Sequence, residues 1–400
     1  MTSHPNDMQP ADHQASTTSL ACWCGNRALE LYSPNYVHCP VCDTLVWADK
    51  GKNQQASMDY SEEGYYGSRY WFEHQTEELG LEDIRHRSRS DLSGRCLYWL
   101  KSLLKHRLPP ASALELGSSH GGFVAMLAKC GYAASGLEIS PQIVDYARQA
   151  FQVPMLVGTI EEQKIPAGSL DLLILMDVLE HLPDPAATLR HGVRLLKPDG
   201  LLVIQTPCFD PGLTFEELNA GEHPFARMLI PFEHIHLFSE QGITKLLHQL
   251  ELPYLAFEPA YFAVHDMFVF ASRVPIPTLP AEAIEAHLLS TPDGRLILAM
   301  LDVYDQLESA NADRAARLEI INEQDKHINE QSKQISDFDN KYREIRHQND
   351  NLLDQINDLT QMVNEFGSVI QKQDRVLKWL PHNILRRLIR SLSTKKAKES

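Results

Sequence analysis

Two acidic side chains and a glycine-rich turn have the types and the spacing to bind a nucleoside. An apolar segment over 112–116 contains Glu115 and leads, before an expected helix over 122–129, into a turn of small residues: Gly117, Ser119 and Gly121. A strand, a tight turn and a helix N-terminus leave a notch of nucleotide size, where backbone amides meet the ligand. Glu138 ends the next expected strand, about 20 residues further on, where a carboxylate can accept both ribose hydroxyls. The sequence therefore predicts a nucleoside cofactor.

The order of the small residues indicates which cofactor this is. A dinucleotide site has the pattern Gly-x-Gly-x-x-Gly, whereas this turn reads Glu115-x-Gly117-x-Ser119-x-Gly121. It resembles motif I of the class I S-adenosylmethionine (SAM) methyltransferases, Asp/Glu-x-Gly-x-Gly-x-Gly. Ser119 replaces the middle glycine, where a side chain makes a positive φ less accessible. The resemblance implies an α/β, Rossmann-like fold, SAM as cofactor, and cofactor contacts at the end of the second strand from Glu138 and Ile139.

Later motifs follow in the order that this family shows, and the resemblance spans roughly residues 65–273. A continuous apolar run over 169–177 is typical of a buried parallel strand. The sequence Leu-Lys-Pro-Asp-Gly, which ends at Gly200, is characteristic of the superfamily when it precedes an apolar strand. The elements expected after that run are a helix over 187–196, a turn over 197–200, and strands over 201–206 and 267–270. The further cofactor contacts implied by the resemblance are Thr159, Ile160, Glu161 and Asp177.

Aromatic and basic residues precede motif I. Tyr66 and Tyr70 resemble a Tyr-x-x-x-Tyr segment that many relatives place as a lid over the methionine carboxylate of SAM. The neighbouring Trp71 and Phe72 can equally pack the first helix. Three arginines form either a solvated helix face or a surface that binds substrate phosphate or cofactor carboxylate. They are Arg85, Arg87 and Arg89.

Histidines near the C-terminal ends of the expected strands are the candidate bases. Methyl transfer from a sulfonium requires the protein to align the nucleophile and to remove its proton. His181 is the expected base, with His234 and His236 as alternatives. Asp177, Glu180 and His181 also share one helix face and resemble the divalent-metal triplet of ubiquinone-type O-methyltransferases. In metal-free relatives, the acid instead caps the helix and contacts the cofactor.

Four cysteines near the N-terminus form a second motif. Cys22 and Cys24 lie on one expected turn, and Cys39 and Cys42 lie on another. Thiolates on two such turns can meet around a tetrahedral metal, so we expect a structural zinc ribbon. The C-x-C spacing of the first pair is one residue short, and His38 is a possible substitute ligand. A disulfide and metal-free packing are the alternatives. The ribbon resembles those of sugar C-methyltransferases and of several glycan-cluster methyltransferases.

Composition favours a large protein with appendages on one enzymatic domain. The chain has 400 residues, 43% of them hydrophobic, and a net charge of −16, which argues against general nucleic-acid binding. It has no uncharged apolar run of 18 residues and no signal-like apolar core at its start, so a cytoplasmic location is expected.

The expected parts are a disordered N-terminus (1–18), the zinc ribbon (19–50), the methyltransferase domain (58–274), a linker and helix (275–317, helical over 281–308), a coiled coil (318–380) and a basic amphipathic tail (381–400).

A heptad repeat predicts the coiled coil. Apolar residues dominate positions a and d, while β-branched residues at a and Asn349 at a favour a parallel dimer. Isoleucine at both a and d near Ile345 leaves a trimer open, and one helix folded back on its own domain is the alternative. The a positions are Ile321, Ile328, Ile335, Tyr342, Asn349, Ile356, Val363, Ile370 and Leu377. The d positions are Gln324, Gln331, Phe338, Ile345, Leu352, Leu359, Phe366, Gln373 and Leu380.

The C-terminal tail combines apolar and basic residues. Such a helix suits the surface of an anionic membrane, although it could also cap the coiled coil or dock on a partner protein. Its apolar residues are Trp379, Leu385, Leu388, Ile389 and Leu392, and its cations are Arg386, Arg387, Arg390, Lys395, Lys396 and Lys398.

These features together predict a SAM-dependent methyltransferase that modifies a sugar hydroxyl of a bacterial surface glycan, such as O antigen. The enzyme is expected in the cytoplasm, peripheral on the inner face of the cytoplasmic membrane, with no nucleic-acid partner. One alternative is a nucleotide-sugar C-methyltransferase. Another is a coiled-coil scaffold with a decayed methyltransferase domain.

Overall fold

The computed structural model describes residues 20–48, 82–221, 223–379 and 381–396. They belong to two compact units, 1–308 and 309–400. The predicted N-terminal segment 1–18, the start of the predicted methyltransferase domain, and the predicted lid residues Tyr66 and Tyr70 lie outside the described residues.

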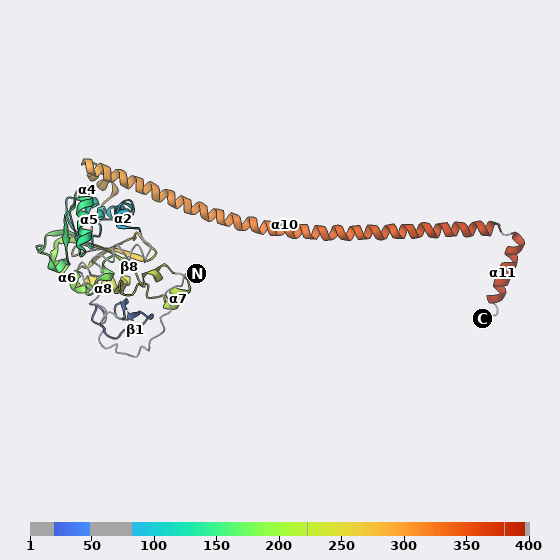
Figure 1. Cartoon of the computed structure of the whole chain (residues 1–400), viewed down its shortest axis with the longest axis horizontal. Helices are drawn as coiled ribbons and strands as arrows, with labels where there is room; N and C mark the ends of the chain where they lie inside the picture. The colour runs from blue at the N-terminus through green and yellow to red at the C-terminus, as the bar shows by residue number, and fades with distance from the viewer. Residues whose placement is uncertain (1–19, 49–81, 222, 380, 397–400) are drawn as a thin grey trace. The chain divides into compact units, whose positions relative to one another are not determined.

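A seven-stranded sheet forms the centre of the first unit (Figure 1). Its strand order is β10-β11-β8-β7-β4-β5-β6, in which β8, β7, β4, β5 and β6 are parallel and β11 pairs antiparallel with both β8 and β10. This mostly parallel sheet confirms the predicted Rossmann-like α/β class. The strands are β4 (Ser112–Leu116), β5 (Ala133–Glu138), β6 (Met155–Val157), β7 (Leu170–Met176), β8 (Leu196–Pro207), β10 (Tyr254–Glu258) and β11 (Asp266–Ser272).

Helices cover both faces of this sheet. Along β7, Leu172 and Ile174 pack in one core cluster with helices α3 and α4, whereas Leu173 and Leu175 pack in another with α6 and α8. Since successive strand residues point to opposite faces, burial on both faces requires the continuous apolar run seen in the sequence. The helices are α2 (Ile84–Asp91), η2 (Leu92–Cys96), α3 (Leu97–Leu104), α4 (Gly122–Cys130), α5 (Pro141–Phe151), η3 (Ile160–Glu162), η4 (Leu179–His181), α6 (Pro185–Leu195), α7 (Phe215–Ala220), η5 (Pro224–Met228), α8 (Glu240–Gln249) and α9 (Ala281–Leu288).

Three expected boundaries differ from the structure. The helix expected over 187–196 begins at Pro185, because the Asp184 side chain caps it by accepting from the amide of Ala187. The turn expected over 197–200 lies inside β8 as a bulge, between the pairs Leu170–Leu196 and Leu172–Leu201. The single helix expected over 281–308 is interrupted between α9 and α10.

The break after α9 has a local cause. Helix α10 begins at Pro292, which lacks an amide hydrogen and disfavours a helical conformation in the residue before it. Gly294 then passes so close to the α9 end that a Cβ there would lie 2.2 Å from the carbonyl oxygen of Leu288. The chain therefore starts a new helix instead of continuing the old one.

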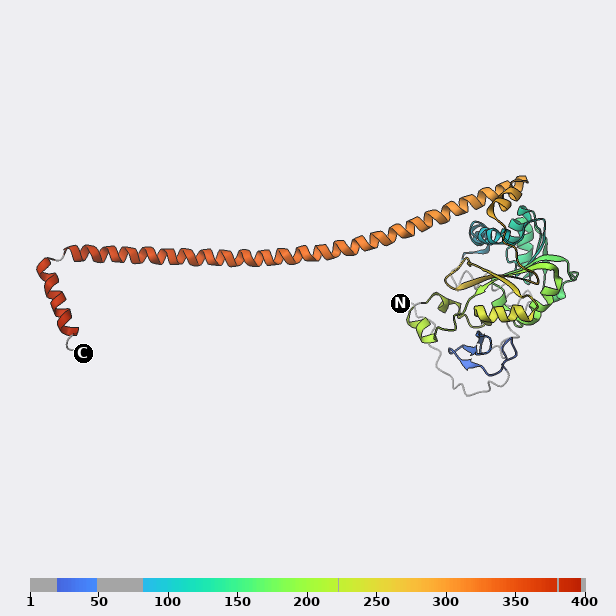
Figure 2. The ribbon, with the colours of Figure 1, turned by 180° about the vertical axis from the view of Figure 1, so that it is seen from behind.

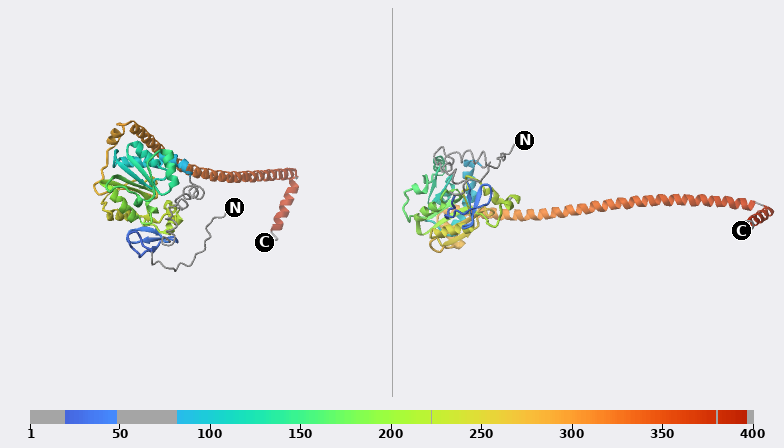
Figure 3. Two further views of the ribbon diagram at one scale, coloured as in Figure 1. Left: turned by 60° about the vertical axis from the view of Figure 1, so that its left-hand side comes forward. Right: turned by 90° about the horizontal axis from the view of Figure 1, so that it is seen from below.

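A second, four-stranded sheet includes Cys39, and the other early cysteines lie in the loops next to its strands. Its order is β1 (Glu30–Leu31), β2 (Tyr36–Cys39), β3 (Thr44–Trp47) and β9 (His236–Phe238). Strand β9 comes from the segment that precedes α8, so the N-terminal strands and the larger domain share one sheet. Figure 3 shows this small sheet, in blue, beside the green and yellow segments of the domain. We call residues 20–48 the cysteine module.

The second unit is helical (Figure 2). Helix α10 (Pro292–Trp379) has 88 residues, and α11 (His382–Lys396) follows after Pro381. Seam residues of the predicted heptads are largely exposed in this single chain, for example Ile335 at 66% and Phe338 at 73%. Pairing of α10 with another helix therefore remains a prediction. Among the described helices, none is both long and apolar enough to span a bilayer.

Candidate active site

A cavity of about 690 Å³ opens at the C-terminal ends of the parallel strands. Most of the predicted cofactor and catalytic residues reach it from separate loops, because the carboxyl ends of parallel strands meet at one edge of the sheet. Predicted residues in its lining are Glu115, Gly117, Ser119, Glu138, Ile139, Thr159, Ile160, Glu161, Asp177, His181 and His234.

Glu138 joins the two loops at the centre of this edge. Its Oε2 accepts a hydrogen bond of 3.1 Å from the amide of Ser119, and its Oε1 accepts bonds of 2.9 and 3.1 Å from the amides of Ile139 and Ser140. Burial raises the pKa of Glu138, and the three amides oppose that rise by stabilising the carboxylate. The carboxyl group is therefore fixed in position at the end of β5.

The glycine-rich turn has positive φ at all three of its predicted small residues, including the serine. Gly117, Ser119 and Gly121 have φ values of +68°, +48° and +76°. Gly117 is in contact with the next loop, since a Cβ there would lie 2.4 Å from Cγ2 of Val178. Gly121 does not line the cavity and packs behind it, with its Cβ position 2.9 Å from the Cβ of Ala147.

Two buried oxygens in the cavity wall have no hydrogen-bond partner among the described residues. They are Oε2 of Glu115 and Oγ of Ser119. Burial, followed by the nearby Glu138 carboxyl group, raises the pKa of Glu115 well above its ordinary value. Buried polar atoms in native proteins usually have partners. These two atoms are therefore suited to contact a polar ligand.

A buried cation near the turn was missed by the sequence analysis. Arg95, in η2, lines the cavity, lies 2.9 Å from Asp91 and 3.5 Å from Asp177, and stacks its guanidinium over the ring of Trp99. Burial opposes ionisation of Asp91, but the hydrogen bond with His120 and the nearby Arg95 lower its pKa to about 2. The cavity thus contains a fixed ion pair near the cofactor turn.

Of the three arginines singled out in the sequence, only one reaches the cavity. Arg87 lines it and lies 3.7 Å from Asp91. Arg85 and Arg89 are exposed on α2. The solvated-face interpretation therefore describes those two residues. Sequence spacing alone does not distinguish Arg87 and Arg95, which line the cavity, from the exposed arginines. The positions of Arg87 and Arg95 depend on how α2 and η2 pack against α4.

Two candidate histidines meet in the lining of the cavity. The rings of His181 and His234 lie edge to face with centroids 5.0 Å apart. Nδ1 of His181 is 2.9 Å from the carbonyl oxygen of Glu233, and Nδ1 of His234 is 2.7 Å from that of Met228. Since a carbonyl only accepts hydrogen bonds, Nδ1 carries the proton in both rings.

Burial keeps both imidazoles neutral. It lowers the pKa of His181, and burial together with the neighbouring His181 lowers the pKa of His234 to about 3. The third candidate, His236, is fully buried in β9, where its Nδ1 donates to the carbonyl of Leu182. It does not line the cavity.

Carboxyl groups surround the histidine pair. Glu180 accepts a hydrogen bond of 2.9 Å from Thr206, and burial raises its pKa well above the ordinary value. The potential ligand atoms of Glu180, His181 and His234 lie within 4.8 Å of one another. Asp177 is outside this group, because Gln205 and Arg95 hold its oxygens. The grouping therefore differs from the Asp177, Glu180 and His181 triplet suggested by the sequence.

The last strand adds two cavity residues that sequence analysis missed. Burial and the charge of Asp177 raise the pKa of Asp266 to about 8. The ring of His265 stacks on Phe262 at a centroid distance of 5.5 Å. Because β11 runs antiparallel to β8, its N-terminal end lies at the sheet edge where the parallel strands end, and this brings His265 and Asp266 to the cavity. No local sequence motif marks these two residues.

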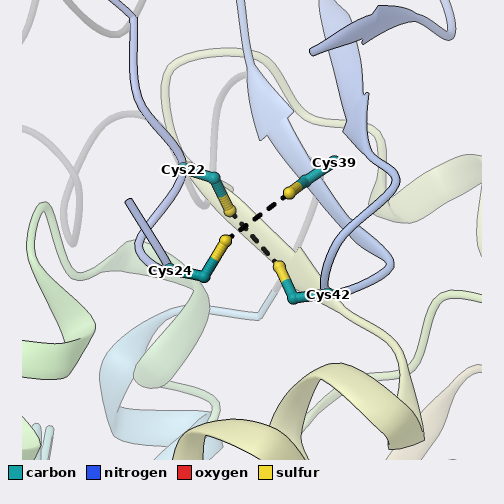
Figure 4. A group of neighbouring side chains, drawn as sticks. All are labelled: Cys22, Cys24, Cys39 and Cys42. Atoms are coloured by element: carbon teal, nitrogen blue, oxygen red, sulfur yellow. Dashed lines mark hydrogen bonds between the residues drawn. The ribbon is translucent and has the colours of Figure 1, made fainter. Parts of the chain in front are cut away.

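The four early cysteines form a separate cluster (Figure 4). Sγ of Cys22 is 3.5 Å from Sγ of Cys42, and Sγ of Cys24 is 3.6 Å from Sγ of Cys39. These distances exclude disulfides in this structure, for which about 2.05 Å is required. A tetrahedral site with Zn–S bonds of about 2.3 Å would place its sulfurs about 3.8 Å apart, so the cluster fits zinc. His38 lies outside this cluster and is 3.2 Å from Asp43.

Residues 88–256 match a family model described as a methyltransferase domain. The ubiquinone biosynthesis O-methyltransferase of Xanthomonas axonopodis pv. citri (strain 306) is 35% identical over 131 residues, which are 31% of this chain and 54% of that protein. The protein of the same name from Xanthomonas campestris pv. campestris (strain B100) is 33% identical over 128 residues, covering 30% and 53%. The chain spans about half the length of these curated relatives.

Solved structures resemble about half of the chain. The magnesium protoporphyrin IX methyltransferase of Synechocystis PCC 6803, with bound SAH, is 18% identical and covers 52% of this chain and 97% of that one, with a TM-score of 0.39. The complex between the Trm112 methyltransferase activator of Haloferax volcanii and a methyltransferase contains a chain that is 16% identical, covering 48% and 94%, with a TM-score of 0.39.

Two glycines allow a test of the close packing at motif I. Gly117 and Gly168 have almost the same positive φ, +68° and +66°, so alanine at either should cost about 1–2 kcal/mol of stability. Only Gly117→Ala also forces a Cβ against Val178, while nothing lies within 4 Å at position 168. We expect an additional loss of about 1–3 kcal/mol for Gly117→Ala in urea unfolding. Equal losses for the two variants would contradict the packing described here.

Proposed function

We propose that the protein is a SAM-dependent methyltransferase. The observation that carries this proposal is the buried Glu138 carboxyl group, fixed by three amides beside a motif I turn within a methyltransferase domain. In this position it would accept hydrogen bonds from the two ribose hydroxyls. Because the match covers only part of the chain and of its relatives, the substrate and the role of the remaining segments are also proposals.

Several cavity residues fit the other parts of SAM. Ile160 presents an apolar side chain beside Thr159 and Glu161, which suits an adenine ring. The buried oxygens of Glu115 and Ser119 suit the ammonium and hydroxyl donors of the cofactor, and Arg95 is a cation for its carboxylate. When bound, SAM would supply an electrophilic methyl group.

The histidine pair would remove the acceptor proton. Because Nδ1 of His181 donates to a carbonyl, the proton-accepting nitrogen is Nε2, and the lowered pKa keeps this ring neutral at pH 7. An acceptor oxygen would form a bond to the methyl carbon as the carbon–sulfur bond breaks, leaving a neutral thioether. The hydroxyl proton would pass to Nε2 of His181, with His234 as the alternative base.

The proposed acceptor is a sugar hydroxyl of a bacterial surface glycan, such as O antigen, at the cytoplasmic face of the membrane. The curated relatives named O-methyltransferases support transfer to oxygen. Helix α11 supports membrane attachment, because Arg386, Arg387 and Arg390 accompany exposed apolar residues such as Ile389 and Leu392. A nucleotide-sugar C-methyltransferase is the second candidate, which the cysteine cluster favours through its resemblance to ribbons of that family.

We also propose one structural zinc per chain on the four cysteines. All four sulfurs lie within 4.8 Å of one another, which leaves no open coordination position for substrate. The hydrogen bond from Cys22 lowers the pKa of Cys42 to about 6, so at least one thiol ionises readily. The zinc would stabilise folding and take no part in the methyl transfer.

Replacing Glu138 tests the cofactor assignment. Glu138→Ala removes the expected charge-assisted hydrogen bonds to the ribose, so the free energy of SAM binding should weaken by about 2–4 kcal/mol. Isothermal titration calorimetry gives this value. The control is Asp145→Ala, which removes an exposed carboxylate on α5 and should leave the affinity unchanged. Wild-type affinity in Glu138→Ala would refute the SAM site.

Elemental analysis tests the zinc site. Protein purified without chelators should contain about one zinc per chain, and Cys39→Ser should lose the metal along with stability of the cysteine module. Cys130→Ser is the matched control, because Cys130 is a buried thiol outside the cluster. A four-cysteine site would be excluded if the wild type contained no zinc, or if Cys39→Ser kept zinc at full occupancy.

Two truncations separate assembly from membrane attachment. A chain ending at Glu308 should be a monomer, since it keeps the α10 residues Ile297, Leu301 and Tyr304 that pack in the domain core and loses the heptads. A chain ending at Trp379 should remain oligomeric but lose binding to anionic vesicles. Light scattering and vesicle flotation measure these properties. A monomeric full-length protein, or flotation that persists after the second truncation, would overturn the tethered model.

A further inference from the structure

The cysteine module contacts the chain segment that carries one of the cavity histidines. Strand β3 pairs with β9 in an antiparallel register, with Thr44 opposite Phe238 and Val46 opposite His236. The pairing continues beyond the strand, where the amide of Trp47 donates 3.0 Å to the carbonyl of Ile235. Backbone hydrogen bonds therefore attach the module to the chain just after His234, from Ile235 onward.

Tyr36 adds a side-chain anchor at the histidine itself. Its hydroxyl donates a hydrogen bond of 2.9 Å to the backbone carbonyl of His234, and the whole tyrosine is buried. Its ring packs in an apolar cluster with Leu45 and Leu237, one from each partner strand. A buried tyrosine hydroxyl and a buried carbonyl each lose water on folding, so this bond is costly to break.

On its other side, the same segment contacts the loop of the second histidine. Nδ1 of His181 lies 2.9 Å from the carbonyl of Glu233, and the amide of Ile235 donates 2.8 Å to the carbonyl of Glu180. Residues 233–235 thus lie between the cysteine module and η4. The orientation of the His181 ring depends on a carbonyl in the segment that the module holds.

The cysteines lie at the end of the module that contacts α8. Cys39 ends β2 and pairs with Thr44, so Cys42 lies in the tight turn between β2 and β3. The carbonyl of Asp43 accepts from the amide of Ser239, and Gly242 approaches so closely that a Cβ there would lie 2.6 Å from the carbonyl oxygen of Cys42. A metal on the cysteines would therefore order the turn from which β3 starts.

We propose that the cysteine module is a positioning element of the acceptor end of the active site, in which Tyr36 and β3 hold the His181 and His234 rings in place. The inference rests on the proposed methyl transfer in this cavity. The hydrogen bonds described for Glu138 involve only Ser119, Ile139 and Ser140, all outside the module. Loosening the module should therefore disturb the histidines and leave cofactor binding intact.

The test compares two conservative variants of the full-length protein. Tyr36→Phe removes only the hydroxyl that donates to His234, whereas Tyr32→Phe removes a hydroxyl of the same module that donates to the carbonyl of Leu213, away from the histidines. Hydrogen exchange followed by mass spectrometry should show about tenfold faster exchange over 233–238 in Tyr36→Phe, and no change there in Tyr32→Phe. Exchange over 112–116 should stay constant in both.

A second readout follows the imidazoles themselves. Protein labelled with ¹³C at histidine should show shifted signals for His181 and His234 in Tyr36→Phe, assigned with His181→Gln and His234→Gln. If water reaches the loosened His234 ring, its titration should move upward from the low value caused by burial toward the ordinary range. Unchanged signals and unchanged exchange in Tyr36→Phe would overturn the proposal.

The contribution of the metal is tested with Cys39→Ser and with chelator-treated wild type. Both should reproduce the faster exchange over 233–238 while calorimetric SAM affinity stays within twofold of the wild type. Loss of SAM affinity with preserved exchange would contradict the positioning role. If wild type itself fails to bind SAM, the proposed function fails, while the exchange and NMR comparison of Tyr36→Phe with Tyr32→Phe still decides whether the module holds the histidines.

Discussion

The hydrogen bonds to Glu138 fix the spacing between the glycine-rich turn after β4 and the end of β5. The carboxyl group comes from the end of β5, yet one of its three donors, the amide of Ser119, belongs to the turn after β4. A carboxylate this deeply buried is costly unless donors compensate for lost water. The same bonds that stabilise the carboxylate therefore hold the motif I turn against the next strand, and Glu138 also lines the cavity.

Burial has a different effect on the part of the cavity that contains the two histidines. There the carboxyl groups of Glu180 and Asp266 have raised pKa values, while His181 and His234 have lowered ones, and desolvation is the largest cause in each case. Desolvation disfavours the charged form of either type, so this part tends toward neutral acids and neutral bases. A neutral imidazole with its proton fixed on Nδ1 is the form that can accept a hydroxyl proton.

The grouping of residues around the glycine-rich turn could be predicted from sequence because it is built from consecutive segments. A strand, its turn and the next strand place Glu115, Gly117 and Glu138 together whenever the parallel order is kept. The serine in the turn did not prevent its positive φ of +48°. Arg95 and Asp266 were missed because they reach the cavity through helix packing and an antiparallel edge strand, which leave no local pattern.

The histidines show a second limit of sequence analysis. His234 and His236 stand two residues apart at the end of a short strand, where spacing alone would give them the same orientation. Only His234 lines the cavity, because the regular strand begins at His236, which turns into the core and donates to Leu182. Where a strand begins is fixed by its partner, and that partner is β3, over 180 residues earlier in the sequence.

Helix α10 changes its surroundings along its length. All of its buried residues, Gly294, Ile297, Leu301 and Tyr304, precede the unit boundary at Glu308, whereas seam residues from Ile321 onward are exposed. Burying each large aliphatic side chain would stabilise a complex by about 1.5–3 kcal/mol, and the seam repeats such residues over many heptads. A few paired heptads would already exceed the cost of bringing two chains together, estimated at about 4–15 kcal/mol. Pairing of α10 with a second copy, which stays a prediction, would bury this exposed seam.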